Sequence, residues 1–209
     1  MTVKQIYTSC ISQGAYFIES KGESAVIDPL REISVFLDLE KETDSKIKYI
    51  FETHFHADFV SGHLTLSKIT GAPIVFGPGA KTNYESISAI DNQVFRIGDI
   101  SLTVLHTPGH TLESTSYLLR DSEGNEKCIF TGDTLFLGDV GIPDVAQRYQ
   151  GVSKQELAGI LYDSVNKKIK PLDENILIYP GHGAGSACGK NMMKETVDTL
   201  KNQKKVNYA

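Results

Sequence analysis

The sequence predicts a mixed α/β protein with mostly antiparallel strands at its sheet edges. Short runs of β-type residues alternate with turn signals along most of the chain, and helical patterns occur in only a few stretches. The composition is that of an ordinary globular protein, with 40% hydrophobic and 22% charged residues among 209. A chain of this size can bury one sizeable core, so we expect a single domain over residues 1–209.

The amino-terminal half is expected to alternate strands with two short helices. Lys21-Gly22-Glu23 separates two β-type runs, which is typical of a hairpin. Gly71 follows a helical pattern and predicts its end, because glycine readily adopts the left-handed conformation found there. The expected strands are 15–20, 24–28, 47–52 and 73–76, and the expected helices are 33–41 and 60–70.

The carboxy-terminal half is expected to hold five more strands and two helices. Ser153 and Glu156 form an S-x-x-E capping box, which predicts a helix from that point to about Lys168. The polar stretch 138–151 before it is expected to be a loop. The expected strands are 94–97, 101–106, 115–119, 127–131 and 176–179. A loop at 180–189 should then lead into a final amphipathic helix that ends in the polar tail 202–209.

Charge and cysteine content exclude several classes of partner. The formal net charge is -5 and no basic run exceeds a lysine pair, so neither nucleic acid nor a membrane surface is expected as a partner. Cys10, Cys128 and Cys188 are widely spaced and form no C-x-x-C, which indicates neither a disulfide framework nor a thiolate zinc knuckle. With no signal-peptide pattern and no run of 18 apolar residues, a cytoplasmic, reducing location is expected.

Side chains that bind metals follow four of the predicted strands. The set comprises His54, His56 and Asp58, then His110, Asp133 and His182, and each of the last three lies at a turn beside glycine. Alternation along the first three residues places them on one side of an extended chain. Imidazole and carboxylate groups at several strand ends are what a metal site on one rim of a sheet requires. The sequence therefore predicts a metal centre.

Three further residues near these motifs are expected to play supporting or structural roles. His63 and His106 lack the same surroundings, so we expect them to pack or to donate hydrogen bonds. Asp28, in Val-Ile-Asp-Pro, is either a turn residue or a group that orients a ligand histidine.

The order of these motifs resembles the metallo-β-lactamase superfamily. H-x-H-x-D, T-P-G-H-T, G-D-T and Y-P-G-H follow one another over residues 54–182. The resemblance implies an αββα sandwich, in which two mixed β-sheets are flanked by helices and the metal site lies on one edge. The residues at 52–63, 132–136 and 183–190 are similar to the corresponding motifs of the persulfide dioxygenases. The similarity is greatest to the bacterial branch that often carries rhodanese domains downstream. That likeness implies a homodimer and a rhodanese partner.

Phe59 departs from the superfamily's dinuclear pattern, in which a histidine at this position would bind a second metal. Because phenylalanine cannot coordinate, Asp58 and His182 alone would make a poor second site, and a mononuclear centre is expected. The iron hypothesis uses His54, His110 and Asp133 as a two-histidine, one-carboxylate face, which is typical of non-haem Fe(II) oxygenases. The persulfide dioxygenase resemblance assigns one Fe(II) per chain to the same three residues.

The remaining candidate residues would then act around the metal. His56, Asp58 and His182 would orient ligands or substrate through hydrogen bonds. The alternative hypothesis is Zn(II) held by His54, His56 and His110, so the two hypotheses differ in whether Asp133 or His56 binds metal.

The resemblance implies oxidation of a low-molecular-weight thiol persulfide by O2 to sulfite and the free thiol. Ile142 occupies a position where related dioxygenases carry arginine, which argues against a glutathione-type binding mode. Cys188 has two interpretations: a thiolate near the metal at a helix amino terminus, or a small buried residue at a tight turn. Cys10 and Cys128 are assigned to packing.

Two other functions compete with the dioxygenase hypothesis. One is a glyoxalase II-like zinc thioester hydrolase, which Phe59 disfavours. The other is a non-catalytic metal-binding or sulfur-relay module whose partner domain performs the chemistry. A phosphate-binding loop at 183–190 is disfavoured because Ala184 and Asn191 break the G-x-x-x-x-G-K-[ST] pattern. A serine hydrolase is disfavoured because no G-x-S-x-G is present.

Overall fold

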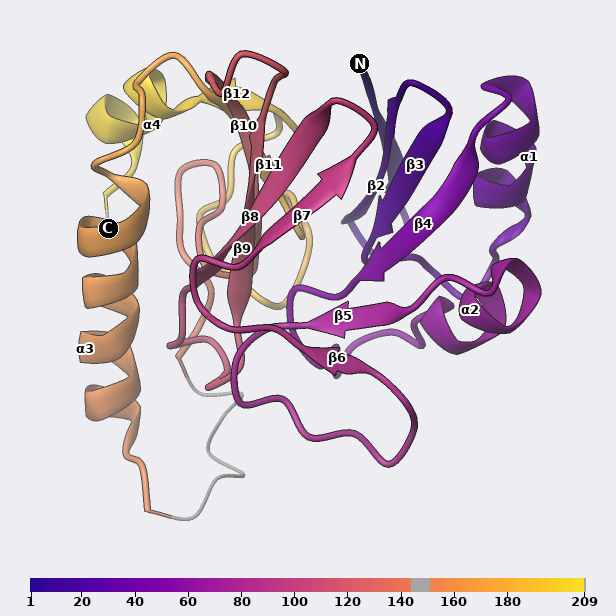
Figure 1. Cartoon of the computed structure of the whole chain (residues 1–209). Helices are drawn as coiled ribbons and strands as arrows, with labels where there is room; N and C mark the ends of the chain where they lie inside the picture. Colours follow the sequence, from indigo (N-terminus) through magenta and orange to yellow (C-terminus); the bar gives the residue numbers. More distant parts are fainter. Residues whose placement is uncertain (144–150, 209) are drawn as a thin grey trace.

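Two β-sheets face each other and carry helices on their outer sides (Figure 1). The computed structural model describes residues 1–143 and 151–208. Within them, the first sheet has the strand order β1-β2-β3-β4-β5-β6 and the second has β12-β11-β10-β9-β8-β7. Helices α1 and α2 lie on the outer side of the first sheet, and α3 and α4 on the outer side of the second. The αββα sandwich implied by the motifs is confirmed.

The bounds of the elements follow chain order. The first sheet is made of β1 (Thr2–Thr8), β2 (Gln13–Ser20), β3 (Glu23–Ile27), β4 (Lys46–Phe51), β5 (Ile74–Phe76) and β6 (Ile87–Ser88). The second is made of β7 (Val94–Ile97), β8 (Ile100–His106), β9 (Thr115–Arg120), β10 (Glu126–Gly132), β11 (Leu177–Pro180) and β12 (Asp198–Thr199). The helices are α1 (Ser34–Glu42), α2 (His63–Thr70), α3 (Lys154–Ser164), which continues as the π-helical turn η2 (Val165–Ile169), and α4 (Leu200–Val206).

Both sheets are mixed, with more parallel pairing than the turn signals indicate. Strands β3, β4, β5 and β6 pair in parallel, as do β10 and β11, while the other neighbours are antiparallel. Helices α1 and α2 return the chain to the start of the next strand, which is the connection that parallel neighbours require. Parallel strands in each sheet end at the same edge, where the metal-binding motifs begin.

The core lies in three layers because side chains alternate along each strand. Tyr16 and Ile18 of β2 point between the sheets, where the Tyr16 ring packs 4.9 Å from that of Phe130. Phe17, between them in the sequence, points outward against Phe36 of α1. A third apolar cluster lies under η2 and α4, on the far side of the second sheet. The burial of these side chains from water is the main driving force that holds the layers together.

Most expected elements are confirmed, including the hairpin, the helix that ends at Gly71 and the capping box at Ser153. Helix α2 begins at His63 rather than residue 60, because Gly62 caps it. The final helix prediction was wrong in position: residues 181–197 form turns and bends, and α4 begins only at Leu200 and runs into the expected tail. Strands β1, β6 and β12 were not predicted. Of the expected loop 138–151, residues 144–150 lie outside the described residues.

The described part of the chain holds no helix that is both long enough and apolar enough to cross a bilayer.

Candidate metal centre

The candidate ligands meet because four strands end at the same edge of the sandwich. His54 follows β4 of the first sheet, whereas His110, Asp133 and His182 follow β8, β10 and β11 of the second. The two sheets approach closely here, since a Cβ on Gly132 would lie 2.6 Å from the Thr53 side chain. The backbone of Gly132 also has a φ of 50°, a conformation that residues other than glycine rarely adopt.

His54, His110 and Asp133 form one buried cluster whose ligand atoms all lie within 4.8 Å of one another. Asp133 Oδ2 lies 3.4 Å from His110 Nε2 and 3.9 Å from His54 Nε2. The three side chains of the iron hypothesis are therefore brought together by the fold, as the motifs imply.

Hydrogen bonds fix which nitrogen of His54 faces the cluster. The Thr53 hydroxyl donates to Asp28 Oδ2 (2.8 Å), so its oxygen accepts the Nδ1 hydrogen of His54 (3.0 Å). The Thr53 amide donates to the other oxygen of Asp28 (2.8 Å) and holds this arrangement in place. The neutral ring therefore presents the lone pair of Nε2 to the cluster.

His110 is fixed in the same way by a backbone group. Its Nδ1 donates to the carbonyl of Ile142 (2.9 Å), which leaves the Nε2 lone pair directed at Asp133. Second partners of this kind commonly orient metal-binding histidines.

The residues present fit a cation. Two imidazole lone pairs and a carboxylate oxygen converge, and Asp133 Oδ2 is buried without a hydrogen-bond partner. Burial holds the pKa of His54 well below its ordinary value. Burial opposes ionisation of Asp133, but His182, His54 and His110 outweigh it and hold its pKa well below the usual range. A neutral imidazole beside an ionised carboxylate is the state in which both bind metal.

His56 lies beside this cluster but in a different group. Its Nε2 is 3.1 Å from Asp28 Oδ1 and 3.4 Å from Glu52 Oε2, and these three residues form a separate buried set. Burial lowers the pKa of His56, but the carboxylates of Asp28 and Glu52 raise it overall to about 9. Its Nδ1 is buried without a hydrogen-bond partner. The placement suits an orienting role, whereas the zinc hypothesis needs His56 to bind the same metal as His54 and His110, which belong to the other cluster.

Phe59 packs its ring against His56, with centroids 4.3 Å apart and an interplanar angle of 34°. An aromatic ring therefore lies next to the candidate centre at the position where a dinuclear superfamily member would carry an imidazole.

Asp58, His182 and Cys188 form a further cluster next to the first. Asp133 joins the two: its Oδ1 accepts the Nδ1 hydrogen of His182 (2.8 Å). Burial lowers the pKa of His182, but Asp133 and Asp58 raise it overall to about 10. Burial opposes ionisation of Asp58, yet His182 lowers its pKa overall.

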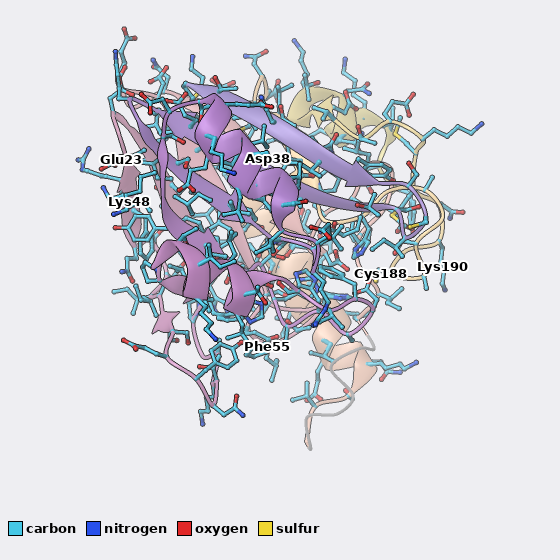
Figure 2. The ribbon with its side chains drawn as sticks, turned by 90° about the vertical axis from the view of Figure 1, so that its right-hand side faces the viewer. Glu23, Asp38, Lys48, Phe55, Cys188 and Lys190 are labelled. Carbon is cyan, nitrogen blue, oxygen red and sulfur yellow. The ribbon has the colours of Figure 1, made fainter. Side chains whose placement is uncertain are left out.

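Cys188 lies in the loop after β11, as Figure 2 shows, near Lys190 and on the opposite side of the view from Glu23 and Lys48. The helix amino terminus considered for it is absent, because no helix begins between residues 181 and 197. Burial and the nearby Asp133 carboxylate raise the pKa of the thiol instead of lowering it.

The supporting residues behave largely as the sequence indicates. His63 lies 3.3 Å from Glu52 Oε1 and 2.9 Å from the Tyr84 hydroxyl, and His106 donates to the Leu112 carbonyl (2.9 Å). Asp28 fulfils both roles considered for it: its φ is 50°, and it orients His54 through Thr53.

Glu52 is a buried site residue that the sequence reasoning did not assign. It contacts both His56 and His63 and accepts a hydrogen bond from Ser61 (2.6 Å). Burial raises its pKa. An acidic residue at the end of an otherwise apolar strand was the available signal.

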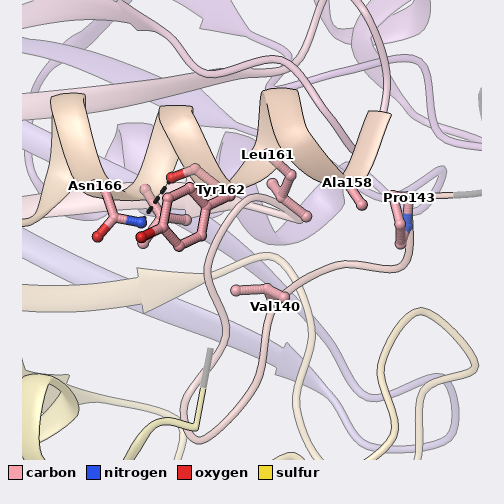
Figure 3. A pocket seen from close by; sticks show the side chains of 7 residues that line it. Val140, Pro143, Ala158, Leu161, Tyr162 and Asn166 are labelled. Carbon is pink, nitrogen blue, oxygen red and sulfur yellow. Dashed lines mark hydrogen bonds between the residues drawn. The ribbon is translucent and has the colours of Figure 1, made fainter. Parts of the chain in front are cut away.

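An apolar cavity of about 190 Å³ lies between α3 and the loop that holds His110 in place. Figure 3 shows Leu161 and Tyr162 of α3 facing Val140 and Pro143 across it. Asn166 at its edge donates to the Tyr162 carbonyl (2.8 Å). Ile142 lies between Val140 and Pro143 in the sequence, but its side chain is not among those that line the cavity.

Comparison with known proteins identifies the family. A family model described as the metallo-beta-lactamase superfamily matches residues 11–182. The chain belongs to this superfamily. A metallo-beta-lactamase from Staphylococcus aureus is 35% identical, with a TM-score of 0.87 over 99% of this chain and 62% of that one. ETHE1 from Myxococcus xanthus is 29% identical, with a TM-score of 0.82 over 100% of this chain and 84% of that one. The likeness to ETHE1 supports a persulfide dioxygenase-like member.

Curated relatives include hydrolases. The cytoplasmic hydroxyacylglutathione hydrolase of Arabidopsis thaliana is 30% identical over 185 residues, which are 86% of this chain and 67% of the relative. A probable hydroxyacylglutathione hydrolase of Schizosaccharomyces pombe is 32% identical over 78% of this chain and 60% of its own. The chain thus spans about 60–67% of the length of these two relatives.

Proposed function

We propose that this protein is a persulfide dioxygenase with one Fe(II) held by His54, His110 and Asp133. The observation that carries the proposal is the composition of the buried cluster: two imidazole nitrogens and one unpaired carboxylate oxygen converge, and Phe59 instead of a histidine directly follows Asp58. Such a face leaves coordination positions open for two reactants, as in non-haem iron oxygenases. The substrates would be a low-molecular-weight thiol persulfide, O2 and one water, and the products sulfite, with its protons, and the free thiol.

Iron would supply the redox chemistry, which no side chain in this chain can perform. The protein would hold the metal ligands and the reactants in position. Thr53 and Ile142 hold the two imidazoles in their ligating tautomers, and Asp133 is held by His182. Bringing two dilute reactants together in such a setting contributes up to about 7–11 kcal/mol in well-aligned cases.

The surface beside the centre bears on the thiol carrier. Ile142 stands where the related dioxygenases carry arginine, and the described residues that line the cavity beside this segment include no guanidinium to grip a substrate carboxylate. These features support a carrier less dependent on carboxylate recognition than glutathione. A cytoplasmic homodimer that works with a rhodanese domain remains part of the same proposal.

A zinc-dependent hydroxyacylglutathione hydrolase is the second candidate, because curated relatives at 30% and 32% identity bear that name. His56, whose ring nitrogens are both buried without a hydrogen-bond partner, would be the additional donor to this reaction's metal. Phe59 weighs against the dinuclear form of such a site.

One experiment separates the candidates. The protein is purified without oxygen, its metal is measured, and oxygen uptake with glutathione persulfide is followed beside hydrolysis of S-lactoylglutathione. Bound iron with persulfide-dependent oxygen uptake supports the dioxygenase. Zinc with thioester cleavage supports the hydrolase, and a folded protein with neither activity supports a metal-binding or sulfur-relay module.

Two variants test the ligand assignment. Asp133→Ala should abolish iron retention, whereas His56→Ala should keep the metal and slow turnover. The opposite pattern, with iron lost from His56→Ala and kept by Asp133→Ala, would contradict the iron assignment.

A further inference from the structure

Asp139 is a buried carboxylate that lies outside the clusters of candidate ligands in the described part of the chain. It is 2% exposed and belongs to the loop after β10, in the same segment as Asp133. A buried ion is costly unless hydrogen bonds compensate for the loss of water. Asp139 has such hydrogen bonds from three parts of the chain, so its carboxylate is a fixed acceptor.

Each oxygen of Asp139 accepts two hydrogen bonds. Oδ2 accepts from the amides of Lys190 and Asn191, at 2.6 and 2.7 Å. Oδ1 accepts from the amide of Val140 (2.8 Å) and from the hydroxyl of Tyr208 (2.5 Å). Burial opposes ionisation, but these donors outweigh it and lower the pKa of Asp139. The loop after β10, the loop after β11 and the residues after α4 therefore meet at one carboxylate.

The residues that follow Asp139 in the chain lie against two candidate ligands. A Cβ on Gly141 would collide with the carbonyl oxygen of Asp133 and would lie 3.1 Å from His110 Nδ1, so the backbone there runs close to both residues. One residue later, the carbonyl of Ile142 accepts the Nδ1 hydrogen of His110 (2.9 Å). A shift of the segment 139–142 would therefore move the group that selects the tautomer of His110.

The peptide of Ile142 is also held by the loop after β11. Its amide donates to the carbonyl of Cys188 (3.0 Å), which lies two residues before Lys190 in that loop. The hydrogen bond from the Lys190 amide to Asp139 ties the same loop to the start of the segment 139–142. Asp139 therefore holds Ile142 by two routes, one along the segment and one through the loop after β11.

We propose that Asp139 is a positioning residue, which holds the segment 139–142 so that His110 presents the lone pair of Nε2 to the metal. Neutral imidazole in water favours the tautomer with its hydrogen on Nε2, which has no lone pair there. The Ile142 carbonyl reverses this preference, because it accepts a hydrogen from Nδ1. The inference rests on the proposed ligand set, in which His110 binds the metal under the iron and zinc hypotheses alike.

Helix α4 and the residues after it support the same loop. Gln203 Oε1 accepts from the amide of Gly138 (2.7 Å), and the side-chain amide of Asn207 donates to the Asp139 carbonyl (3.0 Å). Tyr208 adds its hydroxyl to Asp139 Oδ1, although its side chain is 64% exposed. Removal of this hydroxyl from the surface should therefore weaken metal binding at a buried site.

The test reads the tautomer of His110 in the metal-free protein, well above the ordinary pKa of histidine, from long-range ¹H–¹⁵N correlation spectra. The wild type should show the form with its hydrogen on Nδ1. Asp139→Asn should show a larger share of the Nε2–H form, because an amide side chain has only one accepting oxygen. Asp121→Asn is the matched control: Asp121 Oδ1 also accepts from two backbone amides, but in the turn between β9 and β10, and the wild-type pattern should persist.

Affinity for Fe²⁺, measured without oxygen by competition with a chelator, is the second readout. It should fall about 10–100-fold in Asp139→Asn, fall less in Tyr208→Phe and stay unchanged in Asp121→Asn. The proposal is overturned if wild-type His110 carries its hydrogen on Nε2, or if folded Asp139→Asn keeps either the wild-type tautomer or the wild-type affinity.

Two outcomes need a separate reading. If circular dichroism shows that Asp139→Asn does not fold, Tyr208→Phe decides, and a wild-type tautomer pattern and affinity in that variant would overturn the proposal. A wild-type protein that binds no Fe²⁺ contradicts the iron assignment alone, because the tautomer of His110 is read without metal and without turnover.

Discussion

His182 is the group whose charge should most strongly link the stability of the metal-free protein to pH. Its side chain is fully buried between Asp133 and Asp58, each 2.8 Å from one ring nitrogen. Burial lowers its pKa, but the two carboxylates raise it overall from 6.5 to about 10. A raised pKa in the folded state contributes stability that is complete below pH 6.5 and is lost as pH rises through about 10. At about 1.4 kcal/mol for each pKa unit, this difference corresponds to about 5 kcal/mol.

Urea denaturation of the chelator-treated protein, from about pH 6 to about pH 10, measures this contribution. The free energy of unfolding of the wild type should fall by about 4 kcal/mol more than that of His182→Gln over this range. His106→Gln is the control, because its ring contacts the Leu112 carbonyl away from the candidate centre, and it should follow the wild-type curve. Parallel curves for the wild type and His182→Gln would refute the reasoning.

Three other substitutions test packing and positioning. Gly181→Ala would place a Cβ 2.6 Å from Asp133 Oδ1, so metal affinity should fall about 10–100-fold while the circular dichroism spectrum is unchanged. Competition with a chelator measures the affinity. Unaltered affinity would show that the carboxylate has room to move. Tyr16→Phe removes the hydroxyl that donates to the Pro180 carbonyl (2.5 Å) and should cost about 1–3 kcal/mol in urea denaturation. Phe36→Ala empties a fully buried site under α1 and should cost about 3–5 kcal/mol by the same assay; a loss below about 1 kcal/mol would mean that the outer layer collapses around the gap.

The sequence predicted the strands that carry the candidate ligands because each combines an apolar run with a turn signal. The run before His54 and the one before Asp133 are both buried strands, β4 and β10, with ends close to those expected. Strands β6 and β12 are only two residues long, and β1 is partly exposed along its length, so none of them carries a strong apolar signal. Their pairing depends on a neighbouring strand, which local patterns do not reveal.

The candidate centre was predictable in its residue types but not in its connections. The motifs predicted His54, His110 and Asp133 as metal ligands. The hydrogen bonds that connect Asp28 through Thr53 to His54 could not be predicted, because Asp28 lies far from the other two residues in the sequence. One interpretation placed Cys188 near the metal, and it does lie beside Asp58 and His182, but its loop is held by contacts to Ile142 and Asp139 and not by the helix amino terminus considered for it.

The candidate centre draws its donors from both halves of the sandwich. His54 belongs to the end of the first sheet, while His110 and Asp133 belong to the second. A cation held there would link the two sheets at the edge where Gly132 already allows them to approach closely. At a free cation concentration a thousandfold above its dissociation constant, binding would raise the free energy of unfolding by about 4 kcal/mol. Loading with metal and resistance to heat should therefore rise together, whichever reaction the centre performs.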